Sequence, residues 1–155
     1  MRKVLLLGVV GAALYAGTAN HGAPVASTAH ASGVAATAIA FAQGQIGKPY
    51  VYGATGPDTF DCSGLMQAAW AAAGVSIPRT SEAQWAALPH VSSPQPGDLI
   101  FYTGSPIDPP PGHVTMYVGG GEMIEAYGTG VPVRETPVRP GATGYADPAA
   151  GGGSA

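Results

Sequence analysis

The sequence predicts an α+β fold, in which helices come first and a run of antiparallel strands follows. Alanine-rich stretches with helical spacing lie in the first half of the chain, whereas strand-like alternation gathers after residue 98. The two patterns do not alternate as they would in a series of βαβ units. The 155 residues, 46% hydrophobic and 10% charged, provide for one folded domain.

Three helices are expected from apolar spacing and from stop and cap signals. Gly47 and Gly74 supply the stops of the first and second helices. The order Ser81-Glu82-Ala83-Gln84 has the form of a capping box and so predicts the start of the third. The expected ranges are Val34–Ile46, from Asp61 or Cys62 to Ala73, and Ser81–Leu88.

A hairpin is the main strand feature. Alternation from residue 113 to 118 places His113, Thr115 and Tyr117 on one face of a strand. Three consecutive glycines, 119–121, predict the turn that follows. The expected strands are Leu99–Tyr102, His113–Val118 and Glu122–Tyr127, with a short extended piece at Tyr50–Tyr52 and an edge strand at Val131–Val133.

Residues 1–31 have the pattern of a secretory signal peptide. Arg2 and Lys3 precede a short apolar stretch, and small-residue cleavage patterns end at Ala19, Ala29 or Ala31. We expect export, with an uncleaved signal anchor as the alternative. A folded domain is then expected over residues 32–140 and a disordered glycine- and alanine-rich tail over residues 141–155.

The charge balance disfavours two classes of partner. The formal net charge is −3, and the predicted leader carries two of the six basic residues. A mildly acidic protein without a basic stripe is a poor candidate for binding nucleic acid or an anionic membrane surface. We expect no stable membrane insertion after the leader is removed, and a monomer.

Cys62 is the single cysteine, so it has no partner for an intramolecular disulfide. It is either a tolerated buried thiol or a reactive one. A helix beginning at Asp61 or Cys62 would favour the thiolate through the helix dipole and would aim the Cys62 backbone N–H at an oxyanion. Asp61 and Ser63 beside it fit either helix capping or a functional role.

His113 is the candidate base, because His21 and His30 lie in or near the leader and His90 in a predicted loop. If the glycines form a three-residue turn, Glu125 projects from the same face as His113 as a diagonal neighbour. A five-residue turn would place the two directly opposite, and a two-residue turn would put Glu125 on the wrong face. A carboxylate in reach would fix the imidazole tautomer.

In five ordered blocks the sequence resembles the NlpC-type family of bacterial cell-wall cysteine peptidases. The blocks span roughly residues 35–140 and are Gly47–Gly53, Phe60–Leu65, Pro78–Ser81 with Gln84, Gln95–Phe101, and Gly112–Val114 with Tyr117–Gly119 and Met123–Ile124. The resemblance departs at Ala54 and Thr115, where smaller residues are usual, and in a longer proline-rich stretch before His113.

The resemblance implies a papain-like fold, so that residues 32–140 would be a cysteine peptidase domain. It implies a triad of Cys62, His113 and Glu125, with Tyr50 near the oxyanion and Asp61 and Ser63 holding the substrate. The implied substrate is the peptidoglycan stem peptide, most often cut between D-glutamate and the diamino residue. No cofactor is expected, and no metal site, because the histidines lack zinc spacing.

Three alternatives remain open from sequence. An amidase or acyltransferase would use the same cysteine and histidine on another bond. A non-catalytic wall-binding domain would keep the fold without the reaction. The leader does not distinguish housekeeping wall remodelling from a role as a toxin or lysin. In each case the expected location is outside the cell or in its envelope.

Overall fold

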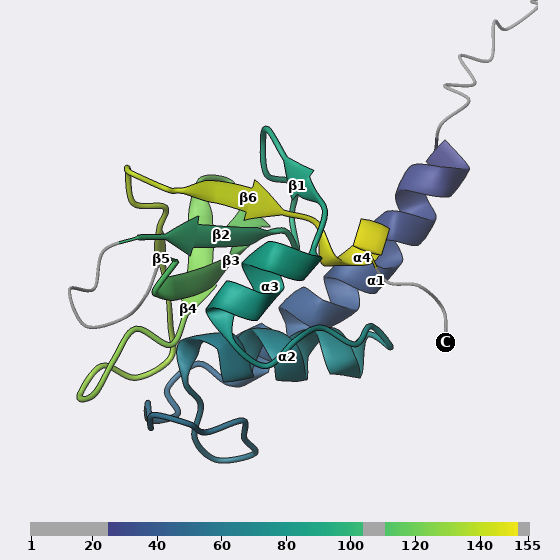
Figure 1. Cartoon of the computed structure of the whole chain (residues 1–155). Coiled ribbons are helices and arrows are strands. Elements are labelled where there is room, and N and C mark those ends of the chain that lie inside the picture. The colour runs from purple at the N-terminus through teal and green to yellow at the C-terminus, as the bar shows by residue number, and fades with distance from the viewer. Residues whose placement is uncertain (1–24, 104–110, 152–155) are drawn as a thin grey trace, which may run out of the picture.

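A computed structural model describes residues 25–103 and 111–151, with three helices leading into a six-stranded sheet and a short helix at the end (Figure 1). The helices are α1 (Val25–Gly44), α2 (Cys62–Ala72), α3 (Ser81–Ala87) and α4 (Pro148–Gly151). The strands are β1 (His90–Val91), β2 (Leu99–Tyr102), β3 (His113–Gly119), β4 (Glu122–Glu125), β5 (Arg134–Pro137) and β6 (Gly144–Ala146). The predicted α+β fold class is confirmed.

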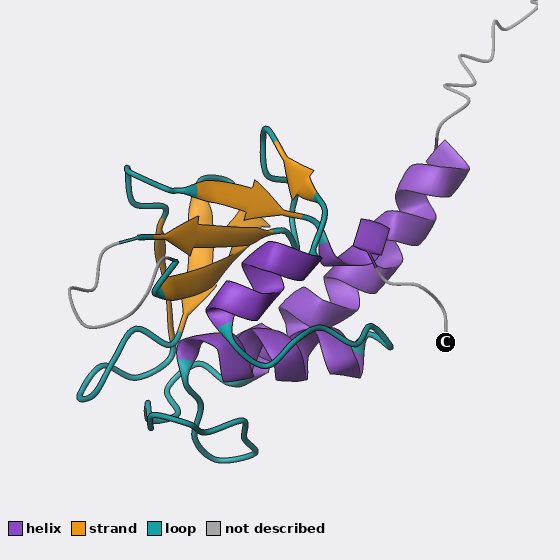
Figure 2. Ribbon diagram, viewed as in Figure 1, coloured by secondary structure: helices purple, strands orange, loops and turns teal. Residues whose placement is uncertain are grey.

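The sheet is antiparallel throughout, in the order β1-β6-β2-β3-β4-β5. Helices α1 and α2 pack together, and α2 contacts the central strand β3 (Figure 2). Between them lies the main core, built from buried side chains of α2 and of the helix-facing side of the sheet, such as Leu65, Trp70, Phe101 and Met116. A smaller cluster around Ile100, Tyr102 and Met123 lies on the other face. Because side chains alternate along each strand, the sheet contributes to two apolar layers, one on each of its faces.

Helix α1 agrees with its apolar spacing: Ala38 and Ala42 are fully buried. It begins at Val25, nine residues before the predicted start, and ends at Gly44. The predicted leader boundary at residue 31 therefore falls inside α1, while residues 1–24 lie outside the described residues. No helix among the described residues is long and apolar enough to cross a bilayer.

The capping box predicted for α3 is wrong. Thr80 is the N-cap, and its hydroxyl accepts the Ala83 N–H at 3.2 Å. Ser81 instead donates to the Pro111 carbonyl at 2.8 Å. The Gln84 side chain is fully buried, and its amide donates to the carbonyls of Ser63 at 3.1 Å and Pro78 at 2.9 Å. Gln84 therefore ties α3 to the start of α2, a long-range contact that local sequence rules do not contain.

Two other predictions fail after residue 125. The edge strand expected at Val131–Val133 lies at β5, because residues 128–131 form a small turn with an isolated bridge. The tail predicted to be disordered from residue 141 contains β6, which pairs with both β1 and β2, and then α4. Residues 152–155 lie outside the described residues. Strand β6 therefore lies between β1 and β2, and at Gly144 a Cβ would collide with the Trp85 ring.

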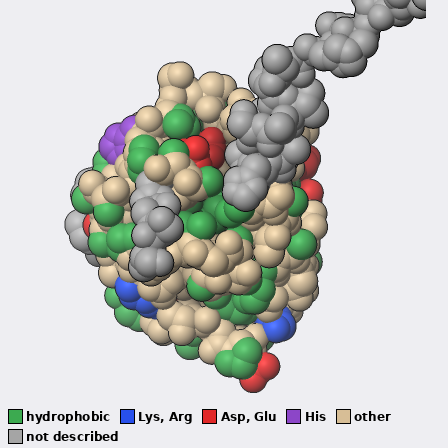
Figure 3. Space-filling model, turned by 90° about the vertical axis from the view of Figure 1, so that its right-hand side faces the viewer, with side chains coloured by type: hydrophobic (Ala, Val, Ile, Leu, Met, Phe, Trp, Pro, Cys, Tyr) green, Lys and Arg blue, Asp and Glu red, His purple; other side chains and the backbone are tan. Residues whose placement is uncertain are grey.

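Much of the surface is uncharged. The face turned toward the viewer in Figure 3 carries scattered charged side chains among hydrophobic and neutral ones. Among the described residues the cations of lysine and arginine are Lys48, Arg79, Arg134 and Arg139. Their positions matter for the site, because three of these four side chains bind the carboxylates beside Cys62 and His113.

Candidate active site

Cys62 is the first residue of α2, as predicted, and its side chain is half-buried. Asp61 is the N-cap: its backbone is extended, and its carboxylate accepts the Gly64 N–H at 2.7 Å. The first N–H groups of a helix have no partner within the helix and carry partial positive charge. The free cysteine therefore lies at the positive end of α2.

The Asp61 carboxylate binds groups from several neighbouring segments of the chain. Besides capping α2, it accepts the Gly53 N–H at 2.9 Å and a two-pronged ion pair from Arg79, at 3.1 and 2.7 Å. The Ser63 hydroxyl accepts a further Arg79 N–H at 2.9 Å. Hydrogen bonding to Asp61 is the main cause that raises the pKa of Arg79, with smaller contributions from Cys62 and Tyr52. The capping interpretation of Asp61 thus holds in the structure, and a role for Asp61 and Ser63 in substrate binding stays a prediction.

The segment that carries Tyr50 is fastened in front of α2. The Val51 N–H donates to the Phe60 carbonyl at 3.1 Å, and the Phe60 N–H donates to the Pro49 carbonyl at 3.2 Å. Further on, the Asp61 N–H donates to the Ala54 carbonyl at 2.9 Å. Tyr50 and Cys62 both pack against the main core cluster. The role of Tyr50 at the oxyanion stays a prediction.

Gly64 explains how this segment can lie so close to the helix. A Cβ built at Gly64 would overlap the Ala54 carbonyl oxygen, so the backbone approach requires glycine. The glycine that follows Asp61-Cys62-Ser63 therefore fixes the distance between α2 and the loop that bears Tyr50.

His113 is the first residue of β3, and Tyr102 of β2 lies directly opposite. One ring nitrogen, Nε2, lies 2.9 Å from Oε2 of Glu125. This contact leaves Nδ1 as the ring nitrogen that Glu125 does not engage. Burial opposes charge on the ring, but hydrogen bonds and charge interactions with Cys62 and Glu125 outweigh it and raise the pKa of His113. Of the predicted triad, a hydrogen bond joins His113 to Glu125, and Cys62 is among the groups that raise the pKa of His113; the triad itself stays a prediction.

Glu125 ends β4 and its side chain is fully buried. Burial would raise the pKa of this carboxyl, yet hydrogen bonds from His113, Arg139 and Arg134 lower it to about 2. Arg139 spans both oxygens, with contacts of 2.7 Å to Oε1 and 2.8 Å to Oε2. Arg134, directly opposite on β5, binds Oε1 through two nitrogens at 3.1 and 2.9 Å. The carboxylate is thus held ionised beside the histidine.

Sequence reasoning assigned no role at the site to Arg79, Gln84, Arg134 or Arg139. Arg79 and Gln84 lie in the third block of the family resemblance, which was a usable signal. Arg134 and Arg139 carried no such signal. The strand after residue 125 was expected three residues too early, and so Arg134 was not paired with Glu125. Among the described residues, no group of three or more His, Cys, Asp or Glu side chains is arranged to hold a metal ion.

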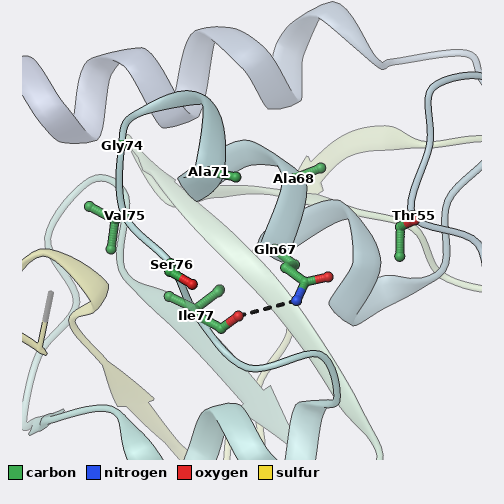
Figure 4. Close-up of a pocket in the computed structure, with 8 residues that line it drawn as sticks. All are labelled: Thr55, Gln67, Ala68, Ala71, Gly74, Val75, Ser76 and Ile77. Carbon is green, nitrogen blue, oxygen red and sulfur yellow. Dashed lines mark hydrogen bonds between the residues drawn. The ribbon is translucent and has the colours of Figure 1, made fainter. Parts of the chain in front are cut away.

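A hollow of about 540 Å³ lies beside α2. Figure 4 shows Gln67 of α2 beside Ile77, with a hydrogen bond of 3.2 Å from the Gln67 amide to the Ile77 carbonyl. None of the predicted site residues lines this hollow. The candidate site is therefore defined by side-chain geometry rather than by this hollow.

A helix whose first residue is the cysteine, packed on an antiparallel sheet that supplies a histidine and its carboxylate, defines a papain-like α+β fold with a Cys–His–Glu site. Comparison with known proteins gives the same class. Residues 47–144 match the model of the NlpC/P60 family. The chain belongs to this family, as the sequence resemblance predicted.

Several relatives carry names that bear on function. The chain is 50% identical over 96 residues to the "Probable endopeptidase p60" of Listeria monocytogenes, which covers 60% of this chain and 19% of that protein. It is 42% identical over 116 residues to the "Probable endopeptidase Cgl2188" of Corynebacterium glutamicum, covering 73% of this chain and 53% of the relative. The chain thus spans between about a fifth and about half of the length of these curated relatives.

Solved structures agree. The peptidoglycan hydrolase RipB of Mycobacterium tuberculosis matches with a TM-score of 0.64 and 39% identity, over 80% of this chain and 70% of that one. The P60 domain of antigen MAP1204 from M. avium subspecies paratuberculosis matches with a TM-score of 0.65 and 37% identity, over 76% of this chain and 95% of that domain. The predicted enzyme class, a cysteine peptidase, agrees with the names of these relatives.

Proposed function

We propose that this chain is an exported cysteine endopeptidase that hydrolyses a peptide bond in peptidoglycan stem peptides, between D-glutamate and the diamino residue. The observation that carries the proposal is the hydrogen bond between His113 and Glu125, together with the place of Cys62 as the first residue of α2. The names of the relatives, which include peptidoglycan hydrolases and endopeptidases, support the substrate class. Export rests on the leader pattern of residues 1–31.

Each residue has one task in the reaction. The Cys62 thiolate attacks the scissile carbonyl carbon, and the Cys62 N–H with the Tyr50 side chain stabilises the oxyanion. The imidazolium of His113 gives its proton to the leaving amine as the C–N bond breaks and the thioester forms. Water, deprotonated by His113, then attacks the thioester, and Cys62 leaves as the thiolate. Glu125 holds the ring through Nε2 and stabilises its positive charge.

The experiment is digestion of defined stem peptides by the wild-type protein and by Cys62→Ala, with product masses measured. We expect the wild type to release a fragment ending in D-glutamate and the variant to release none. Products from cleavage between the sugar lactate and L-alanine would instead establish an amidase. An acyltransferase would transfer the acyl group to an added amine.

A non-catalytic wall-binding domain predicts a different set of results. Iodoacetamide would fail to modify Cys62 in the folded protein at neutral pH, and the wild type would bind walls without releasing peptides. For the proposed enzyme we expect fast modification, slowed in His113→Ala, because the thiolate is paired with the ring. The cell envelope location is tested separately, by fusing residues 1–31 to a reporter enzyme and assaying the culture medium and the envelope.

A further inference from the structure

The single negative charge of Glu125 is bound by two positively charged guanidinium groups as well as by the ring of His113. Arg139 alone engages both carboxylate oxygens, and His113 binds one of them. Arg134 adds a second guanidinium on Oε1 only. The cluster therefore carries a net charge of about +1 with a neutral ring and +2 with an imidazolium, beside the histidine of the site.

Both arginine side chains remain partly open to solvent. The side chains of Arg134 and Arg139 are 42% and 34% exposed, whereas Glu125 is fully buried. A guanidinium has five N–H donors, and the bonds to Glu125 engage only two on each arginine. Donors are therefore left on the exposed side for a second acceptor.

Tyr127 places this charge next to the catalytic histidine. Its ring lies 5.2 Å from the guanidinium carbon of each arginine and meets the His113 ring edge-on at 5.7 Å. Contact with an aromatic face restrains the planes of the two guanidinium groups. The ring is 53% exposed, so the patch of Arg134, Arg139 and Tyr127 forms a surface that begins at His113 and reaches solvent.

The position of the patch indicates which part of a substrate meets it. His113 gives its proton to the leaving amine, so the residue after the scissile bond lies on the His113 side of the nucleophile. The arginine on the Cys62 side, Arg79, is already bound to Asp61 and Ser63. We propose that Arg134, Arg139 and Tyr127 form a subsite for a carboxylate of the leaving residue.

The proposal rests on the proposed endopeptidase function and adds the chemistry of the residue after the cut. A diamino residue offers an α-carboxylate and, in dicarboxylic members of this class, a carboxylate on its side chain. Either anion would be drawn by the local positive potential in a chain whose net charge is −3. An arginine presents parallel N–H groups that match a carboxylate, which a neutral amide cannot replace in full.

The test compares three stem peptides that differ only in the leaving residue: both carboxyl groups free, the α-carboxyl amidated, and the side-chain carboxyl amidated. We expect kcat/KM of the wild type to fall about tenfold for one of the amidated peptides, which identifies the carboxylate that is bound. In Arg134→Gln the kcat/KM values for that amidated peptide and for the peptide with free carboxyl groups should become nearly equal. The variant should remain active, because Arg139 and His113 still hold Glu125.

Lys48→Gln is the matched control, since it removes one positive charge elsewhere and should keep the wild-type ratio. Equal cleavage of all three peptides by the wild type, or an unchanged ratio in Arg134→Gln, overturns the subsite. If the arginines serve only Glu125, the variant loses activity equally on every peptide and the ratio persists. Cleavage of none of the peptides by the wild type would reject the proposed function, and the subsite with it.

A second measurement needs no variant. The released product with free carboxylates should inhibit the wild type about tenfold more strongly than the amidated product, and added salt should narrow this difference. Equal inhibition by the two products would overturn the subsite, whether or not Arg134→Gln folds.

Discussion

His113 Nε2 and Glu125 Oε2 meet at 2.9 Å across a hairpin whose turn alone would separate them. Gly119 pairs with Glu122, so the turn has two residues, and continuing that register would set Glu125 opposite Met116 in the helix-side core. A β-bulge between Tyr117 and Gly119 shifts the pairing by one residue, so that Met116 faces Ile124. Glu125 then falls on the His113 face. The bulge thus assembles the acidic half of the site.

In Glu125→Gln both the rate of peptide hydrolysis and the pKa of His113 should fall. The neutral amide keeps the shape but no longer stabilises the imidazolium, so kcat/KM should fall about 100-fold or more. Because Glu125 raises the pKa of His113, the alkaline limb of the pH–rate profile should move to lower pH. Peptide hydrolysis measured across pH tests both. Glu122→Gln on the same strand is the control, and an unmoved profile in Glu125→Gln would contradict the assignment.

Glu125 should also make the fold sensitive to acid. Its pKa in the fold is about 2, below its ordinary value of 4.5. The carboxylate therefore stabilises the protein above pH 4.5, and this contribution, at most about 3 kcal/mol, is lost as the pH falls toward 2. Urea unfolding at several pH values between 2 and 6 measures it. Glu125→Gln should be less stable at pH 6 and should lose less stability on acidification; equal acid losses in the two proteins would refute this.

Asp98 should act in the opposite direction. Burial, with Asp147 nearby, raises its pKa from 3.8 to about 6, although the Gln95 N–H lowers it. The contribution of Asp98 to the stability of the fold is therefore fully present below pH 3.8, and it is lost as the pH rises through about 6. Asp98→Asn keeps an acceptor for Gln95 and should gain about 1–3 kcal/mol relative to wild type at pH 8, with little gain at pH 4. The exposed Asp58→Asn serves as control, and a gain independent of pH would contradict the prediction.

Gln84 should be needed for the stability of the nucleophile helix. Gln84→Leu leaves the carbonyls of Ser63 and Pro78 without their side-chain donor and should cost about 1–3 kcal/mol of unfolding free energy. Thermal unfolding measures the loss. The exposed Gln95→Leu should change stability little, and an equally mild effect of Gln84→Leu would show that α3 does not brace α2.

Gly64→Ala should move the loop that bears Tyr50 away from α2. The added Cβ would overlap the Ala54 carbonyl, with an expected cost of about 1–3 kcal/mol. We expect slower acylation of Cys62 as well, measured by the burst of product in rapid mixing. Gly33→Ala in α1 meets no atom within 4 Å and should stabilise the protein slightly. Wild-type stability and acylation in Gly64→Ala would disprove the close-packing argument.

The local signals were enough for α2, β2 and the start of β3. Their stops, caps and alternation act within a few residues, and the structure places them within one residue of the expected bounds. The same kind of signal failed for β5 and β6, because short, half-exposed strands take their stability from neighbours such as β4 and β2 rather than from their own sequence.

By itself, then, the sequence determined that a helix would begin at Asp61 or Cys62 and that His113 would open a strand, because helix caps and strand alternation depend on nearest neighbours in the chain. It made Glu125 the partner of His113 only for a turn of three or five residues. The turn has two residues, and the β-bulge beside it brings Glu125 to the His113 face. Tertiary structure alone decided that Arg134, Arg139 and Arg79 gather at the site and that Gln84 braces α2. Those contacts join residues from separate elements, and their energies arise only when burial makes a carboxylate or a carbonyl require a partner.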